Sequence, residues 1–267
     1  MNKIPVMDDN LSKEKPLLSV RNLSKNFGGV TAVNHVCFDV FPGEIVGLIG
    51  PNGSGKTTIF NCLTGLLESD PGSEIIFNNS NITNKKTHTI AQLGLTRAFQ
   101  EARIFLGLNV IENLLVSIQQ YQEDNLFFRF WNGRSLREYE KKGEERAFEL
   151  MEFVGLTHHA YTPSRELSYG QRKLLIFAMT IMSKPSLVLL DEPAAAVNLT
   201  AIEHIKEYIK KLNQNNITFL IIEHNMEMIM GLCQRIIVLD YGKIIAEGSP
   251  REVQSNDEVI DAYFGRE

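Results

Sequence analysis

Apolar runs of strand length recur along the chain, and three of them have the character of buried parallel strands. Glu44–Ile49, Leu187–Leu190 and Thr218–Ile222 are short, mostly apolar and rich in Ile, Leu and Val. Strands that are covered on both faces form continuous runs of this kind. Helical patterns over Ala201–Gln214 and Met226–Cys233 follow the second and third runs, which predicts an α/β fold with a parallel sheet.

Further strand patterns lie towards both ends of the chain. Leu17–Val20 and Glu74–Phe77 are short strand-like runs, and Val36–Phe41 alternates apolar and polar residues as a half-buried strand does. Near the C-terminus, Arg235–Asp240 and Lys243–Ala246 flank a short turn that contains glycine. The last two segments are therefore predicted to form a hairpin.

The section from about residue 101 to 165 changes to helical periodicity with interspersed charges. We expect a helical lobe, about residues 101–170, inserted into a single α/β domain that spans residues 17–267. Residues 1–16 are polar, contain two prolines and are expected to form a loose lead-in. The aromatic stretch at residues 125–131 is either buried packing or a docking surface, and the sequence leaves both interpretations open.

The strongest chemical motif follows the first buried run. Residues 50–58 have the spacing G-x-x-x-x-G-K-[ST] of a phosphate-binding loop. Glycines let backbone N–H groups converge on a polyphosphate, Lys56 adds a cation, and Thr57 can offer a hydroxyl to Mg²⁺. The helix that follows places its partial positive charge at the phosphates. The predicted nucleoside triphosphate site consists of Gly50, Pro51, Asn52, Gly53, Ser54, Gly55, Lys56, Thr57 and Thr58.

Composition narrows the class of protein around this motif. Hydrophobic residues make up 43% of the 267 residues, enough for a packed core, and no apolar run reaches the roughly 18 residues of a membrane span. A net charge of -5 without a long basic block argues against a broad nucleic-acid surface. Cys37, Cys62 and Cys233 show no C-x-x-C spacing and are expected to be small buried residues. We therefore expect a globular chain in the cytosol.

Two adjacent carboxylates follow the apolar run Leu187–Leu190. Asp191 is placed to hold the water shell of a metal ion, and Glu192 can accept a proton from an attacking water. A helix cap is the alternative interpretation of this segment, but the phosphate loop elsewhere in the chain favours catalysis. The pair therefore predicts that the bound nucleotide is hydrolysed.

A second turn suited to anions precedes the acidic strand. Ser168 and the backbone amides after it open an apolar helical pattern, so a hydroxyl group and a helix N-terminus are directed at the same place. The chain already has one phosphate loop, and we expect this turn to serve the nucleotide of another subunit. An ordinary serine-capped helix is the alternative.

Taken in order, these motifs resemble the ATP-binding subunits of ABC transporters, and the resemblance runs from about Leu17 to Gly265. It implies a P-loop NTPase fold of the α/β class: an ABC ATPase core with a parallel sheet, an antiparallel β subdomain and the inserted helical lobe. The implied ligands are ATP and Mg²⁺. The turn that matches the family signature, which closes over the ATP of the opposite subunit, consists of Ser168, Tyr169, Gly170 and Gln171.

Four further residues receive roles from the resemblance alone. Phe27 matches the aromatic residue that stacks on adenine, with Val33 beside it. Gln100 matches the glutamine that contacts Mg²⁺ and the attacking water, and His224 matches the switch histidine at the γ-phosphate. Considered individually, each is an ordinary core or loop residue. The implied catalytic residues are Glu192, His224 and Gln100, and the implied metal ligands are Thr57, Gln100 and Asp191.

Two departures from the family pattern indicate a subgroup. Tyr169 replaces a glycine that many members have in the signature, and Asn198 stands where many members have aspartate. An amide carries no full charge, so we do not expect the coupling that the family makes between the two nucleotide sites through that aspartate to carry over unchanged. Together with Glu223–Met226 and the ending Val259–Gly265, these residues resemble the ATPases of branched-chain or hydrophobic amino acid importers.

The resemblance also implies partners. Two ATPase subunits, identical or related, would sandwich two Mg·ATP head to tail and move integral membrane permease subunits from the cytoplasmic face of the membrane. A substrate-binding protein would take part indirectly, and no nucleic acid is expected. The alternatives are a soluble ABC-type ATPase clamp or switch that works without a permease, a catalytically inactive regulatory subunit, and the ATPase of an exporter or of a urea or amide importer.

Overall fold

The structure is a computed structural model that describes residues 15–98, 104–118, 133–195 and 199–264. Several sequence predictions fall outside these ranges. They concern the lead-in up to residue 14, the catalytic candidate Gln100, the aromatic stretch at residues 125–131, and Asn198.

A six-stranded sheet contains the predicted parallel strands. Its order is β10-β9-β3-β8-β7-β6, and each neighbouring pair is parallel except the hairpin of β9 and β10. The carboxyl ends of parallel strands meet at one edge of a sheet, and ligands of open α/β sheets bind at that edge. The strands are β3 (Ile45–Ile49), β6 (Leu95–Ala98), β7 (Leu187–Asp191), β8 (Thr218–Ile222), β9 (Arg235–Asp240) and β10 (Lys243–Gly248).

A four-stranded sheet lies beside it. Its order is β2-β1-β4-β5, and all of its neighbours are antiparallel, which confirms the predicted antiparallel β subdomain. The first two strands are longer than their sequence patterns predicted. The chain reverses between them at Gly28, whose φ is 56°. The strands are β1 (Leu18–Phe27), β2 (Val30–Val40), β4 (Glu74–Phe77) and β5 (Ser80–Asn81).

The central strand β3 separates two hydrophobic cores. Successive side chains of a strand point to opposite faces. Val46 and Leu48 therefore share a core with the four-stranded sheet and α1 (Lys56–Leu63), whereas Ile45 and Ile49 pack in the core formed with the helices on the other face. All five residues of β3 are buried, as the continuous apolar run predicted.

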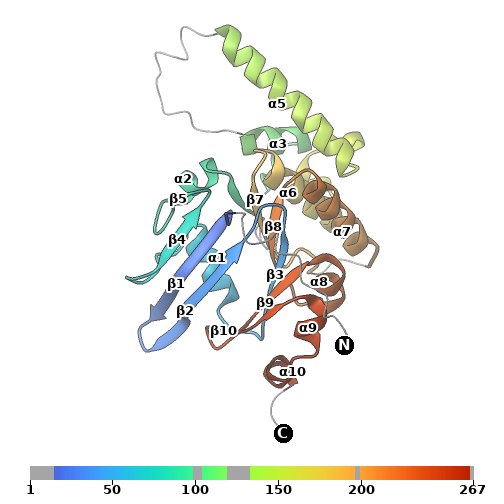
Figure 1. The fold of residues 1–267 in the computed structure, drawn as a ribbon. Helices are drawn as coiled ribbons and strands as arrows, with labels where there is room; N and C mark the ends of the chain where they lie inside the picture. Colours follow the sequence, from blue (N-terminus) through green and yellow to red (C-terminus); the bar gives the residue numbers. More distant parts are fainter. Residues whose placement is uncertain (1–14, 99–103, 119–132, 196–198, 265–267) are drawn as a thin grey trace, which may run out of the picture.

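Helices pack on both faces of the six-stranded sheet, and a separate group of helices lies at one end of the molecule (Figure 1). Figure 1 shows α3 and α5 at the end opposite α9 and α10. None of the helices in the described part of the chain has the length and apolarity that a bilayer span requires. Besides α1, the helices are α2 (Thr87–Gln92), α3 (Val110–Ile118), α5 (Gly133–Phe153), α6 (Tyr169–Ile181), α7 (Leu199–Gln214), α8 (Met226–Leu232), α9 (Pro250–Gln254) and α10 (Asp257–Phe264), with short 3₁₀ turns at Thr157–His159 and Ser164–Glu166.

The helical lobe is tied to the start of α6 by a buried amide. Asn113 in α3 is fully buried. Its Nδ2 donates to Ser164 Oγ at 2.9 Å and to Phe105 O at 3.1 Å. Because a buried polar group is costly without partners, this side chain holds α3 against the segment that leads into α6.

The three cysteines differ in exposure, and this corrects one sequence prediction. Cys62 and Cys233 are buried as expected, and burial raises their pKa values to about 11 and about 12. Cys37 on β2 is exposed, because its neighbour Val36 faces the core and successive strand residues alternate. The pattern around Cys37 alternates, so its outward position could have been inferred.

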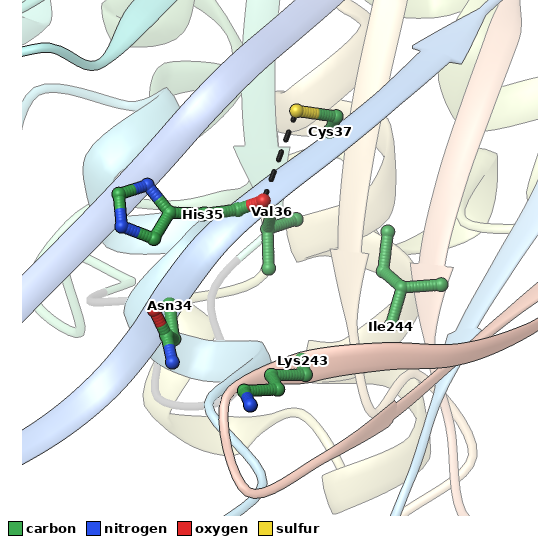
Figure 2. Close-up of a pocket in the computed structure, with 6 residues that line it drawn as sticks. All are labelled: Asn34, His35, Val36, Cys37, Lys243 and Ile244. Carbon is green, nitrogen blue, oxygen red and sulfur yellow. Dashed lines mark hydrogen bonds between the residues drawn. The ribbon is translucent and has the colours of Figure 1, made fainter.

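Cys37 borders a shallow hollow between β2 and β10 (Figure 2). Its Sγ donates to the backbone oxygen of His35 at 3.7 Å. The lining residues are Asn34, His35, Val36, Cys37, Lys243 and Ile244. None of the candidate site residues belongs to this lining, so the hollow is separate from the site described next.

Candidate nucleotide-binding and hydrolysis site

The phosphate loop leaves β3 through backbone conformations that require glycine. Gly50 and Gly55 have φ values of 151° and 106°. A Cβ atom on Gly50 would lie 2.1 Å from Leu239 O, and one on Gly55 would lie 2.4 Å from Ala32 O. Gly53 also has a positive φ, 80°, but its Cβ position is open. The loop is thus packed tightly at both ends, against β9 and β2, and is open in the middle.

Lys56 is held by the loop that surrounds it. The residue is only 5% exposed, and its Nζ donates to Gly50 O and Pro51 O at 2.8 Å each. A third, longer bond of 3.3 Å reaches Ser54 Oγ. Burial lowers the pKa of Lys56, and the negative charges of Glu192 and Asp191 oppose this change. The loop lysine and the acidic pair therefore face one another, as a shared site requires.

The first turn of α1 presents further donors. Gly55 is the N-cap and has no side chain that could cap the helix. Thr57 is exposed and Thr58 is partly exposed at this end. Backbone N–H groups at an uncapped helix start are suited to bind an anion, and the helix dipole adds to the attraction.

Asp191 shares a buried ion pair with an arginine from the neighbouring strand. Arg97 on β6 donates from Nη2 to Asp191 Oδ2, and both side chains are 6% exposed. Arg97 also donates from Nη1 to Asn61 Oδ1 at 2.7 Å and lies 5.4 Å from the centroid of the Phe60 ring. A buried carboxylate needs such a partner. Arg97 thus fixes Asp191 beneath α1, a role that the sequence analysis did not assign.

Glu192 and His224 meet beyond the carboxyl ends of β7 and β8. His224 Nε2 lies 3.2 Å from Glu192 Oε1, with the side chains 44% and 25% exposed, respectively. Glu192 has a φ of 51°, which is uncommon for a residue other than glycine, and its N–H donates to Ile222 O at 2.8 Å. This local conformation turns the side chain away from the strand and towards the histidine. The structure therefore brings together two of the three predicted catalytic residues.

Glu223 is a residue of this site that sequence reasoning missed. It is only 4% exposed, although it carries a carboxylate. Its oxygens accept backbone N–H bonds from Ala194 at 2.6 Å, His224 at 2.8 Å and Asn225 at 3.0 Å. The signal was its position, next to the predicted switch histidine and directly after a buried strand.

The two residues predicted to surround adenine have different environments. Phe27 ends β1 and is 49% exposed, with Lys25 Nζ 5.5 Å from its ring centroid. Val33 is fully buried, and a Cβ atom on Gly55 would lie 3.4 Å from its Cγ2. Stacking of Phe27 on a base stays a prediction. In this structure Val33 supports the phosphate loop from the core and presents no surface to a ligand.

The signature turn is a self-capped helix start. Ser168 is the N-cap of α6: its Oγ accepts the N–H of Gln171 at 3.2 Å, and Gln171 Oε1 accepts the N–H of Ser168 at 2.8 Å. Tyr169 is 51% exposed, and a Cβ atom on Gly170 would meet nothing within 4 Å. Within one chain the turn therefore has the geometry of an ordinary serine-capped helix, which is the alternative interpretation given above. Its contact with a second nucleotide stays a prediction.

The oxygen donors near the loop suit a magnesium ion that is bound together with phosphates. Among the described residues, no group of three or more His, Cys, Asp or Glu side chains could hold a metal ion. Mg²⁺ keeps several waters and takes only one or two carboxylates when phosphates supply other ligands. The exposed Thr57 hydroxyl and the Asp191 carboxylate fit this pattern. Gln100, the third predicted ligand, lies outside the described residues.

Known proteins share both the sequence and the fold. The family described as "ABC transporter" matches residues 33–195. The high-affinity branched-chain amino acid transport ATP-binding protein LivG of Escherichia coli (strain K12) is 40% identical over 252 residues, which cover 94% of this chain and 98% of that protein. The chain belongs to the ABC transporter family. This ABC ATPase also matches the corresponding protein BraF of Pseudomonas aeruginosa at 37% identity over the same shares of each chain.

Solved structures agree with the family assignment. The nucleotide-free form of an ATP-binding cassette from an ABC transporter has a TM-score of 0.81 and 33% identity, covering 94% of this ABC ATPase and 100% of that chain. The ADP conformation of such a cassette gives the same values. Residues 243–267 match a second family, described as "Branched-chain amino acid ATP-binding cassette transporter". The predicted family, fold class and ATPase activity are confirmed.

Proposed function

We propose that this ABC ATPase hydrolyses ATP to drive a membrane permease that takes up branched-chain or related amino acids. The observation that carries the hydrolytic mechanism is the 3.2 Å contact between Glu192 Oε1 and His224 Nε2, beside the buried Lys56. The substrate class is supported by the match of residues 243–267 and by the names of the relatives LivG and BraF.

The phosphate loop holds the triphosphate of ATP. Lys56 Nζ exchanges its bonds to Gly50 O and Pro51 O for phosphate oxygens. Because the loop has already removed most water from this ammonium group, the exchange needs little reorganisation. Backbone N–H groups of the loop and of the first turn of α1 donate to the same oxygens, and Phe27 stacks on the adenine.

Hydrolysis depends on the residues that follow β7 and β8. Glu192 accepts the proton of the attacking water, and His224 orients Glu192 and contacts the γ-phosphate. Thr57, Asp191 and Gln100 would hold Mg²⁺, which would neutralise charge on the phosphate oxygens when it is bound. Arg97 fixes Asp191 in this arrangement through its bond to Oδ2.

Two ATPase subunits, identical or related, pair head to tail around two ATP molecules. The turn of one subunit, with Ser168 exposed and Gly170 partly exposed, closes over the ATP in the phosphate loop of the other. ATP favours the closed pair because it contacts both surfaces, and loss of the γ-phosphate releases it. The helical lobe transmits this motion to permease subunits at the cytoplasmic face of the membrane, and a substrate-binding protein delivers the amino acid to the permease.

The decisive variant is Glu192→Gln in the ATPase bound to the permease subunits that copurify with it from detergent-solubilised membranes. We expect ATP turnover and ATP-dependent uptake of labelled leucine into proteoliposomes to fall at least about 100-fold, because the amide cannot accept the proton. ATP binding should persist, and the ATP-bound pair should accumulate on size-exclusion chromatography.

A matched control is Glu203→Gln, which changes an exposed glutamate on α7 that pairs with Lys206. This variant should keep wild-type turnover and uptake. Wild-type turnover in Glu192→Gln would remove Glu192 from the catalytic role. ATP turnover without any copurifying membrane protein would instead favour a soluble clamp or switch.

A further inference from the structure

A carboxylate joins the two loops that carry the catalytic pair. The last paired residues of β7 and β8 are Asp191 and Ile222, and the two strands end at these residues. Glu223 lies at this point of separation. Its Oε1 accepts the N–H of Ala194 in the loop after β7, and its Oε2 accepts the N–H groups of His224 and Asn225 after β8.

The burial of this carboxylate makes its bonds necessary. Glu223 is 4% exposed, and it takes part in none of the ion pairs found among the described residues. A buried carboxylate without a cation is stabilised by N–H donors that point at both oxygens, and each bond to a charged acceptor is stronger than a bond between neutral groups. The three short bonds therefore hold both loops to the Glu223 carboxylate.

We propose that Glu223 is a positioning residue for ATP hydrolysis, which sets the geometry between Glu192 and His224. Glu192 lies two residues before Ala194, and His224 directly follows Glu223, so each oxygen of Glu223 anchors the backbone beside one member of the pair. Glu223 does not contact the reacting water. It acts by keeping Glu192 Oε1 and His224 Nε2 within bonding distance of one another.

The chemistry of the side chain makes this proposal specific. Glutamine has the size of glutamate but only one acceptor atom, and its amide NH₂ donates. In either orientation, Glu223→Gln therefore sets an N–H group against another N–H group, on the side of Ala194 or on the side of His224. Aspartate keeps the charge and both acceptors but is one methylene shorter, so Glu223→Asp cannot reach both loops in the present backbone.

The experiment is a double-mutant cycle on the ATPase assembled with its permease, because the inference rests on the proposed roles of Glu192 and His224. Glu223→Gln, His224→Ala and the double variant are compared for kcat, for the KM of ATP and for thermal midpoint. We expect Glu223→Gln to lower kcat about 30-fold, with the KM changed less than about twofold. The loss should be smaller than the roughly 100-fold or more that removal of a general base costs, because Glu192 itself is kept. In the His224→Ala background the same substitution should lower kcat by less than about threefold, because the pair it positions is already broken.

Glu44→Gln is the control for the loss of a partly buried, bridging carboxylate. Glu44 accepts the N–H of Phe41 at 2.8 Å and pairs with Arg235, away from the nucleotide site. This variant should lower the thermal midpoint with kcat unchanged. If Glu223→Gln gives no cooperative thermal transition, Glu223→Asp replaces it in the same double-mutant cycle with His224→Ala.

Two results would overturn the proposal. One is a folded Glu223 variant with wild-type kcat. The other is a double variant whose loss of kcat equals the product of the losses in Glu223→Gln and His224→Ala, as expected when the two substitutions act independently. Glu192→Gln, measured in the same series, separates the catalytic role proposed for Glu192 from the positioning role proposed for Glu223. If Glu192→Gln abolishes turnover while Glu223→Gln does not change it, only the positioning role fails.

Discussion

The phosphate loop and the signature turn are both helix starts with a proposed role in binding phosphates, but tertiary contacts shape only the first. In the phosphate loop, Lys56 is buried and bonded to Gly50 O and Pro51 O, and two glycines pack against neighbouring strands. In the signature turn, Ser168 is exposed, and its hydroxyl group accepts a bond from the backbone of its own helix at Gln171. One region is shaped by tertiary contacts, and the other by local capping.

This difference indicates separate roles for the phosphate loop and the signature turn in the proposed nucleotide site. The packed loop supplies rigid, preorganised donors that require no partner for their geometry. The signature turn is geometrically complete as a capped helix, and in the proposed function its surface acts only when a second subunit faces it. Substitutions in the two regions should therefore affect different quantities.

The largest effect is expected for Lys56→Ala. Removal of the ammonium group takes away the cation that meets the phosphates, and ATP turnover should fall at least about 100-fold. Isothermal titration with ATP should show weakened binding to the isolated chain. Lys206→Ala, which removes a partly buried lysine paired with Glu203 on α7, is the control and should leave both quantities unchanged. Strong ATP binding by Lys56→Ala would contradict the importance of the preorganised loop.

A smaller effect, on stability, should separate two glycines of the same loop. Gly55→Ala places a Cβ atom 2.4 Å from Ala32 O, and we expect the free energy of unfolding to fall by about 3 kcal/mol. Gly53→Ala has an open Cβ position and should lose only about 1 kcal/mol, the cost of a positive φ. Urea denaturation midpoints measure both values. Equal losses would mean that the packing against β2 contributes little.

The smallest effect on the isolated chain is expected for Ser168→Ala. Loss of the N-cap bond should reduce stability by about 1 kcal/mol, and Ser168→Thr, which can still cap, should lose less. ATP binding to one chain should not change. In the complex with the permease, however, turnover of Ser168→Ala should fall about tenfold, because the hydroxyl group is lost from the site of the partner's nucleotide. A fall in the ATP affinity of the isolated Ser168→Ala chain would contradict the proposal that this turn contacts only the partner's nucleotide.

The sequence predicted those parts of the candidate site that are local along the chain. The phosphate loop, Asp191 with Glu192, and the helix start at Ser168 are short motifs whose geometry follows from neighbouring residues. Strand β8 was predicted with its observed bounds, and β3 within one residue, because both are continuous apolar runs between turns. The short strand β6 was not recognised, since its two central residues, Thr96 and Arg97, are both polar, so its four residues form neither a continuous apolar run nor an alternating pattern.

Contacts between distant segments were not predictable in the same way. Arg97 and Asp191 are 94 positions apart, and their ion pair depends on the pairing of β6 with β7, which no local pattern specifies. The role of Glu223 depends equally on the place where Ala194 lies in space. Val33 was assigned to the base by resemblance, whereas its complete burial follows from the packing of β2 under the loop.

The unequal burial of the three thiols makes the native chain convenient for fluorescence measurements. Thiolates, not neutral thiols, react with maleimide dyes, and the raised pKa values of Cys62 and Cys233, about 11 and about 12, leave both of them protonated at neutral pH. Dye should therefore attach to Cys37 on the exposed face of β2 without any cysteine replacement. Energy transfer between donor- and acceptor-labelled copies would then report closure of the pair in real time.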